Sequence, residues 1–150
     1  HHIKKFHFQL DTVLGYKQQV LDNRLVEHGA AVAQVTRQEA VLDDARNRRS
    51  DYEAEFEQKK TEGMTMFEAL KYQHCMQALV NEVERETERL ARLRRIEEEK
   101  RARVVESRVE TKTLEKLKEI KLQDYNHAIQ KDEERFIDDL TATKRVLSNA

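Results

Sequence analysis

Apolar residues recur at alternating steps of four and three along the amino-terminal part of the chain, and no other feature restricts its fold more. Between Leu10 and Phe56, nine of the fourteen positions on this track are apolar. Such spacing puts side chains on one face of an α-helix, which is buried against another helix. The nine are Leu10, Leu14, Leu21, Ala31, Val35, Leu42, Ala45, Tyr52 and Phe56. The track predicts one long helix with a helical partner.

The composition agrees with long helices and disfavours disorder. The 150 residues include no proline, only three glycines and 38% charged residues, whereas an ordinary domain has about 5% proline and about a quarter charged residues. Disordered chains are usually rich in proline and lack periodic apolar residues. We therefore expect an all-α fold that forms one elongated domain, because two helices that share a narrow seam leave their other faces in water.

Near Gly63, residues that favour the end of one helix are followed by residues that favour the start of another. Lys59 and Lys60 would occupy a last helical turn, where cations and a following glycine are favourable. Thr65 and Glu68 have the spacing of a capping box, which opens a new helix. The sequence thus predicts an antiparallel coiled-coil hairpin with helices at 6–62 and 66–147 and a turn at 62–65. Residues 6–150 would form a single coiled-coil domain, and residues 1–5 would be a tag remnant or disordered start.

The seam of the second helix is uneven. Apolar residues change track near Lys118, where two successive steps of four make a stutter that locally unwinds a supercoil. Glu97, Lys100 and Ser107 occupy the middle of the seam, so we expect the hairpin to be least apolar and to open most easily there. Because the turn precedes the midpoint of the chain, the second helix should outlast the first or bend near its end. Its last turns would then be available to a partner.

Charge and cysteine usage bear on location and on partner class. Lys plus Arg number 28 and Asp plus Glu number 29, so bulk electrostatics offer no attraction for nucleic acid or anionic lipid. The basic stretch Arg92–Arg103 is interrupted by Glu97–Glu99 and has no stacking aromatic residues. Cys75 is the only cysteine, and the sequence has no stretch of signal-peptide or membrane-spanning length. These features predict a cytoplasmic protein that neither binds nucleic acid nor inserts into a membrane.

Catalysis and metal binding find little support. Acid–base chemistry by a pair such as Glu97 and Glu98 needs a concave site that shifts a pKa, and a two-helix hairpin has no interior of that size. His74, Cys75 and His127 lack the spacing of a structural zinc site. Acidic residues four positions before arginines indicate solvated ion pairs instead. We expect no enzyme activity and no cofactor. The three such pairs are Glu88/Arg92, Glu97/Arg101 and Glu99/Arg103.

Aromatic and apolar residues cluster around the predicted turn. Part of this cluster must close the hairpin, and two narrow helices cannot cover all of it. The sequence leaves open whether the surplus is a local core or an exposed docking patch. The cluster comprises Tyr52, Phe56, Met64, Met66, Phe67, Leu70, Tyr72, Cys75, Met76 and Leu79.

The order of short motifs resembles the FliJ family, the small coiled-coil component of the bacterial flagellar type III export apparatus. The resemblance covers nearly the whole chain and departs at Cys75, where an aromatic residue is more usual. The opening Phe6–Leu10 followed by Val13-Leu14 is similar to the family's FxFxL start. The stretches similar to its fold-back and tail are Gly63–Thr65, Lys71–Leu79, Lys112–Lys118, Tyr125 and Asp132–Leu140.

The resemblance implies a non-catalytic stalk, similar to the γ subunit of rotary ATPases, at the inner face of the cell membrane at the flagellar base. Its partners would be the hexameric export ATPase, whose assembly and activity it would promote, the cytoplasmic domain of the export gate protein, and export chaperones. The residues implied to face the ATPase are Phe6, Phe8, Leu10, Leu14, Ile129, Phe136 and Leu140. Those implied to face the gate are Tyr52, Phe56, Phe67, Tyr72, Met76 and Leu79.

Two other interpretations remain open at this point. A general coiled-coil scaffold that dimerises in parallel would require Gly63 to be helical, whereas a hairpin turns there. The related injectisome stalk shares the hairpin architecture, and the sequence separates it only weakly from the flagellar form.

Overall fold

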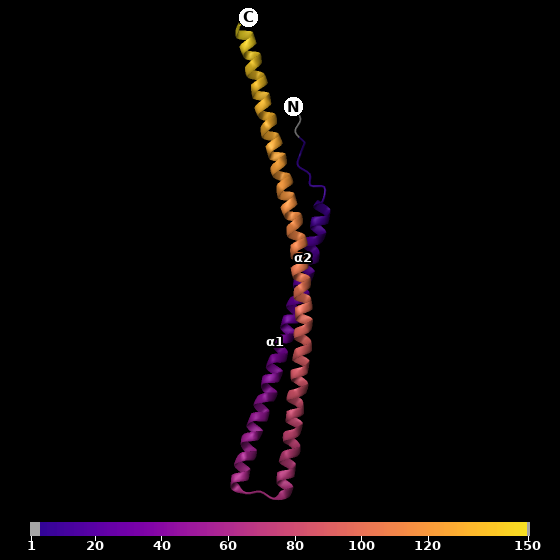
Figure 1. Cartoon of the computed structure of the whole chain (residues 1–150), viewed down its shortest axis with the longest axis vertical. Coiled ribbons are helices and arrows are strands. Elements are labelled where there is room, and N and C mark those ends of the chain that lie inside the picture. Colours follow the sequence, from indigo (N-terminus) through magenta and orange to yellow (C-terminus); the bar gives the residue numbers. More distant parts are fainter. Residues whose placement is uncertain (1–3, 150) are drawn as a thin grey trace. The chain divides into compact units, whose positions relative to one another are not determined.

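A computed structural model describes residues 4–149 of the chain. Two α-helices make up nearly all of this range, α1 at Asp11–Glu62 and α2 at Met66–Asn149, and a short loop joins them (Figure 1). The described residues are 93% helical, and the two helices pack against each other. No strand occurs in the range that the structure describes. The predicted all-α fold of two long antiparallel helices is confirmed.

The chain divides into two compact units. The terminal unit contains the amino-terminal part up to Asp22 and the carboxyl-terminal part from Glu106, and the turn unit spans Asn23–Val105. The single coiled-coil domain expected for 6–150 stays a prediction. The predicted tag remnant or disordered start at 1–5 falls partly on residues 1–3, which lie outside the described residues. Lys4 and Lys5 are described, and the Lys4 carbonyl accepts a hydrogen bond from Tyr125.

The turn between the helices has the predicted stop and start chemistry. Gly63 has a φ of 99°, and its N–H donates to the carbonyl oxygen of Lys59 at 2.9 Å, which is the left-handed cap common after a helix. Thr65 Oγ1 then accepts a hydrogen bond from the backbone N–H of Glu68 at 3.1 Å. The Thr65 carbonyl accepts the first bond of α2, from Ala69 at 3.0 Å. This geometry makes Gly63 a turn residue and argues against the parallel extended dimer.

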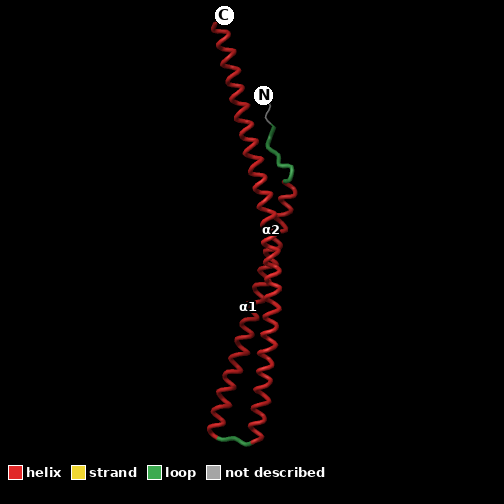
Figure 2. The backbone as a smooth tube through the Cα atoms, in the orientation of Figure 1, coloured by secondary structure: helices red, strands yellow, loops and turns green. Residues whose placement is uncertain are grey.

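The start of α1 differs from the sequence prediction. The helix begins at Asp11 and not near Phe6, and residues 4–10, here called the strap, run beside α2 without helical structure (Figure 2). The Asp11 N–H donates to the Phe8 carbonyl at 3.1 Å. The resulting turn lets the Phe8 side chain be buried to 6% exposure, while the Asp11 carboxylate sits favourably in the first helical turn. Burial of one aromatic ring thus outweighs extension of the helix.

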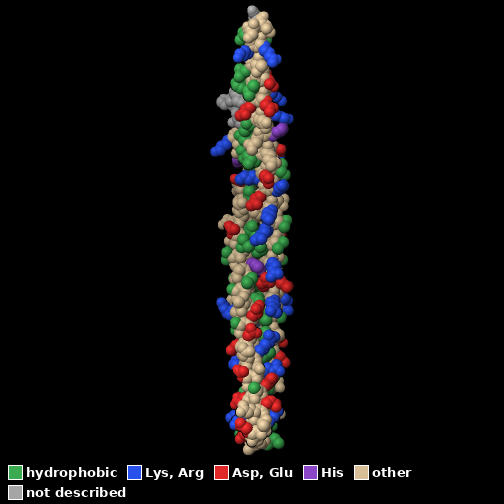
Figure 3. Space-filling model, turned by 90° about the vertical axis from the view of Figure 1, so that its left-hand side faces the viewer, with side chains coloured by type: hydrophobic (Ala, Val, Ile, Leu, Met, Phe, Trp, Pro, Cys, Tyr) green, Lys and Arg blue, Asp and Glu red, His purple; other side chains and the backbone are tan. Residues whose placement is uncertain are grey.

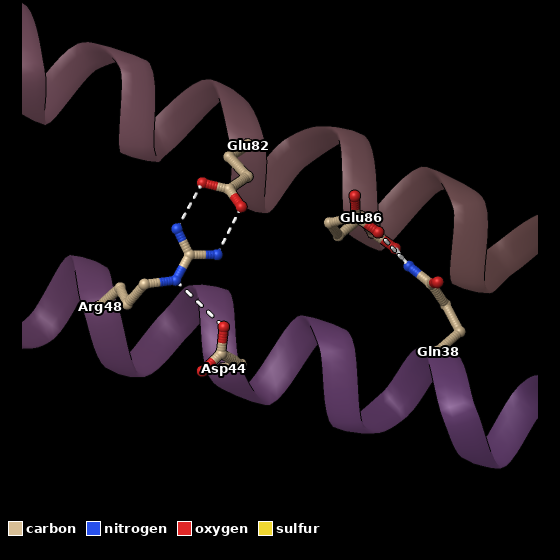
Figure 4. Close-up of polar contacts among 5 residues, drawn as sticks. All are labelled: Gln38, Asp44, Arg48, Glu82 and Glu86. Atoms are coloured by element: carbon tan, nitrogen blue, oxygen red, sulfur yellow. Dashed lines mark hydrogen bonds and ion pairs between the residues drawn. The ribbon is translucent and has the colours of Figure 1, made fainter.

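The core of the turn unit is narrow and mixed in polarity. Leu42 and Ala45 of α1 are 3% and 1% exposed, and a small residue such as Ala45 lets two helices approach closely. Gln38 is also buried, and its amide donates to the backbone carbonyl of Glu86 at 3.1 Å and to the Glu86 carboxylate (Figure 4). Because these two residues are hydrogen-bonded to each other, they help to fix the register of α1 against α2. No buried donor is left unpaired by this contact.

The middle of the seam is polar, as predicted. Glu97 is 8% exposed and Ser107 is 7% exposed. Thr111, which is 2% exposed, donates to the Ser107 carbonyl at 2.8 Å. Lys100 is half-buried, with its Nζ 3.5 Å from a carboxylate oxygen of Glu27. Easier opening at these positions stays a prediction.

In the terminal unit, α2 extends past Asp11, the residue at which α1 begins. Lys118 Nζ lies 2.8 Å from Asp11 Oδ1, at the first residue of α1. Beyond this pair, the strap covers α2 as far as Tyr125, whose hydroxyl donates to the Lys4 carbonyl. From residue 130 to residue 149 the helix is exposed throughout. The last five turns of α2 therefore form a solvent-facing surface.

Candidate protein-binding surfaces

The strap and the first turn of α1 hold the amino-terminal residues that the resemblance assigns to an ATPase-binding end. The Phe6 ring packs on Tyr125, with ring centroids 5.5 Å apart at 48°. Phe8 and Leu14 are buried at 6% and 4% exposure, whereas Leu10 is 38% exposed. Burial gives Phe8 and Leu14 a packing role, so that only Leu10 and part of Phe6 could touch a partner.

A groove of about 650 Å³ runs between the strap and α2. Its apolar lining includes Leu10, Leu117 and Tyr125, and three lysines, Lys4, Lys5 and Lys121, also line it. None of the described residues that line it is acidic. The groove therefore combines apolar and positively charged surface. The sequence gives little sign of this groove, because it exists only when the strap is not helical.

The carboxyl-terminal part of α2 exposes the second group assigned to the ATPase. Phe136 and Leu140 are 50% and 55% exposed, and Ile129 is half-buried. Ile137, which the sequence analysis did not assign, is 59% exposed and widens this apolar stripe. Its position directly after Phe136 in the sequence could have indicated that Ile137 belongs to this apolar surface. In this part of the chain, α1 does not cover the apolar face of α2.

The aromatic residues at the fold-back mostly pack against one another. The Tyr72 ring lies between two rings of α1, with centroid distances of 5.4 Å to Tyr52 and 5.2 Å to Phe56. Its hydroxyl donates to Glu55 at 3.2 Å, and the ammonium of Lys60 lies 4.1 Å from the Phe56 ring centroid. Aromatic pairs at such distances stabilise packing beyond their buried area. This part of the cluster is a local core that joins the two helices.

Burial also changes the acidity of the two tyrosines. Loss of hydration raises the pKa of Tyr52 to about 12, and the neighbouring Cys75 thiol adds to the effect. The pKa of Tyr72 is raised by burial and by its hydrogen bond to Glu55. Both phenols are therefore neutral at physiological pH, and the two side chains pack as uncharged groups.

The exposed part of the fold-back is a different set of residues. Met66 and Phe67 are each 77% exposed, and Leu70 is 58% exposed. We call these three residues the tip patch. Of the residues assigned to the gate, Phe67 belongs to this patch, whereas Met76 and Leu79 are half-buried like the aromatic core. Met66 and Leu70 were not assigned, although they flank Phe67 on the first turns of α2.

Charged side chains cover the rest of the helices as mixed pairs. Figure 3 shows basic and acidic groups interspersed on the face that it draws. Arg48 reaches across from α1 to Glu82 with two hydrogen bonds and also donates to Asp44 at 3.0 Å (Figure 4). The Arg48 guanidinium lowers the pKa of Glu82. The predicted pair Glu97/Arg101 forms a hydrogen bond, but Glu97 is buried, so this pair is not solvated as predicted. The pairs Glu88/Arg92 and Glu99/Arg103 stay predictions.

Neither a metal centre nor a membrane span is found in the described part of the chain. No group of three or more His, Cys, Asp or Glu side chains in residues 4–149 is arranged to hold a metal ion. Over the same range, neither helix has a segment long and apolar enough to cross a membrane. His28 lies against a single carboxylate, that of Glu97.

The fold and its surfaces define an antiparallel helical hairpin with apolar side chains exposed at the fold-back and on the last turns of α2, which is the class of protein-binding coiled coils. The family model described as "Flagellar FliJ protein" matches residues 6–148. The chain therefore belongs to the FliJ family and is a flagellar export apparatus protein. Among the curated proteins and among the solved structures, nothing matches the chain.

Proposed function

We propose that this chain is a non-catalytic stalk of the flagellar type III export apparatus, which binds the hexameric export ATPase, promotes its assembly and activity, and couples it to the export gate. The observation that carries this proposal is the family match over residues 6–148. The family is a non-catalytic component of flagellar export. A helical hairpin without its own chemistry can act by binding some conformations of its partners more tightly than others.

The terminal unit is the proposed ATPase-binding end. The exposed Leu140 and the neighbouring Phe136 and Ile137 supply apolar area on one stripe of α2. Leu10 adds to this area from the strap. Exposed apolar patches among polar residues are typical of protein-binding surfaces. Phe8 and Leu14 would contribute indirectly, by holding the strap in place.

The tip patch is the proposed contact with the cytoplasmic domain of the export gate protein. Met66, Phe67 and Leu70 form compact apolar surface on the first turns of α2. The aromatic core behind them, centred on Tyr72, keeps the two helices together. A rigid support of this kind lowers the entropy lost when a small patch binds. Tyr52, Phe56, Met76 and Leu79 would therefore position the patch.

Export chaperones are the third proposed class of partner, and their contact surface on this chain is unassigned. Binding to the gate would hold the protein at the inner face of the cell membrane without insertion. The cell compartment that we propose is the cytoplasm.

A pulldown from the source organism tests the proposal and separates the two surfaces. The unmodified protein should capture both the export ATPase and the gate protein. A variant with Leu140→Asp should lose the ATPase and keep the gate, and a variant with Phe67→Asp should do the reverse. Val26→Asp, at an exposed apolar position in the first third of α1, is the control and should keep both. Capture of an injectisome ATPase instead would favour the related injectisome stalk, and capture of neither would favour a general scaffold.

A further inference from the structure

Two surfaces of the terminal unit complement each other in charge. The groove under the strap is lined by Lys4, Lys5 and Lys121 around apolar side chains. The α2 segment 133–140, here called the acidic stripe, carries four carboxylates and one cation, Arg135, together with exposed Ile137 and Leu140. Opposite charges around matching apolar areas favour association and set its orientation. The carboxylates are Glu133, Glu134, Asp138 and Asp139.

One chain cannot bring these two surfaces together. Lys121 and the acidic stripe lie on the same unbroken helix, α2. At about 1.5 Å per residue, Lys121 and Ile137 are about 24 Å apart along the axis. A continuous helix cannot fold back over that distance, so the stripe can reach a groove only in another molecule.

A twofold arrangement satisfies both surfaces at once. Ile129 lies midway in sequence between Lys121 and Ile137. If the α2 helices of two copies lie antiparallel with Ile129 at the centre, the stripe of each copy faces the groove of the other. Such an interface is self-complementary, which is the usual form of a protein dimer. Ile129 is half-buried in the single chain, so contact with its symmetry mate would bury the rest of an apolar side chain.

Helical geometry places the apolar residues needed for the dimer contact on one face of α2. At about 3.6 residues per turn, Leu122, Tyr125 and Leu140 fall on the same face of α2 as Ile129. Glu133 and Asp139 flank that face, whereas Glu134 and Asp138 point away from it. The apolar stripe and two of the carboxylates can therefore meet the partner together. The other two carboxylates provide a control within the same segment.

We propose that the free protein forms an antiparallel homodimer in which the acidic stripe of each copy occupies the strap groove of the other. This inference goes beyond the proposed function. Because the dimer covers the end that would face the ATPase, it would be a resting form that ATPase binding must open. Self-association of the purified chain is measured without the ATPase, so its outcome is independent of the pulldown.

Charge reversal with light scattering or sedimentation tests the dimer. The unmodified protein should approach twice the mass of the 17.8 kDa chain as its concentration rises. A groove variant with Lys4→Glu, Lys5→Glu and Lys121→Glu should dimerise at least about tenfold more weakly, because like charges then face each other. A stripe variant with Glu133→Lys and Asp139→Lys should behave in the same way. An equimolar mixture of the two variants should recover a heterodimer.

The matched control carries Glu134→Lys and Asp138→Lys, which change the net charge by the same amount as the stripe variant. It should dimerise like the unmodified protein. Far-ultraviolet circular dichroism of every variant checks that the helices remain. A constant monomer mass up to about 1 mM would overturn the proposal. So would failure of the two reversed variants to pair, or equal loss of dimer in the matched control.

Discussion

Nε2 of His28 on α1 lies 2.8 Å from Oε1 of Glu97 on α2, and this contact joins the two helices at a buried polar position of the turn unit. Arg101, one turn beyond Glu97, donates to the same carboxylate oxygen. Glu97 is 8% exposed. A carboxylate that is this well covered remains ionised only because these donors replace its lost water.

The stability of the hairpin should depend on the charge of Glu97. Hydrogen bonds from His28 and Arg101 hold the pKa of Glu97 below its ordinary value of 4.5, although burial opposes them. The stabilisation is therefore fully present above about pH 4.5 and is lost as the pH falls through the lower folded-state value. Urea unfolding between pH 3 and pH 7 measures this loss. Glu97→Gln should be less stable at pH 7 and should show a smaller decrease on acidification. An identical pH profile for both proteins would contradict the assigned pairing.

The positive φ of Gly63 predicts a cost for any side chain there. Gly63→Ala should lower the free energy of unfolding by about 1 kcal/mol, because an L-residue is strained in the left-handed region. An added Cβ would meet no atom within 4 Å, so the effect would be conformational and not steric. Gly29→Ala is the control, since Gly29 is helical with equally open surroundings. It should stabilise α1 by about 0.5 to 1 kcal/mol. Equal effects at the two positions would argue against the turn described above.

The cap of α2 depends on one hydroxyl. Thr65→Ala removes the acceptor for the Glu68 N–H and should cost about 1 kcal/mol of unfolding free energy. Thr65→Ser keeps the oxygen and should remain close to the unmodified protein. The midpoints of urea unfolding of the unmodified protein and the two variants, compared at one pH, measure these differences in stability. If the serine variant lost as much stability as the alanine variant, the hydrogen bond would not be the cause.

The two parts of the fold-back cluster should respond differently to truncation. Tyr72→Ala removes the ring between Tyr52 and Phe56 and should destabilise the hairpin by about 1 to 3 kcal/mol. Phe67→Ala, at a position that is 77% exposed, should change stability by less than about 0.5 kcal/mol. It should nevertheless weaken binding to the export gate domain, as measured by calorimetry. Unchanged gate affinity in Phe67→Ala would exclude the tip patch as the contact.

Local chemistry explains why the hairpin was predictable from the sequence. The 4-and-3 spacing specifies which faces are buried, and Gly63 and Thr65 act within a few residues of themselves. The strap was not predictable in the same way. Its conformation depends on the burial of Phe8 and on the contact of Phe6 with Tyr125, more than a hundred positions away. No local sequence pattern indicates such packing.

The division of the aromatic cluster has the same origin. Phe67 and Tyr72 both lie near the start of α2, and both carry large aromatic rings. Only the opposing residues of α1 decide that Tyr72 is enclosed and Phe67 is exposed. The sequence therefore located the cluster correctly but could not separate core from surface. For the same reason Met66 and Leu70 were placed in the cluster but were not assigned to the gate.

The most direct test of the central claim is the activity of the cognate export ATPase with and without this protein. If the chain is the stalk that we propose, it should raise both the oligomerisation and the ATP hydrolysis rate of the ATPase. Leu140→Asp should abolish the increase, and Val26→Asp should retain it. Unchanged hydrolysis and unchanged oligomerisation, under conditions where the two proteins bind, would contradict the account.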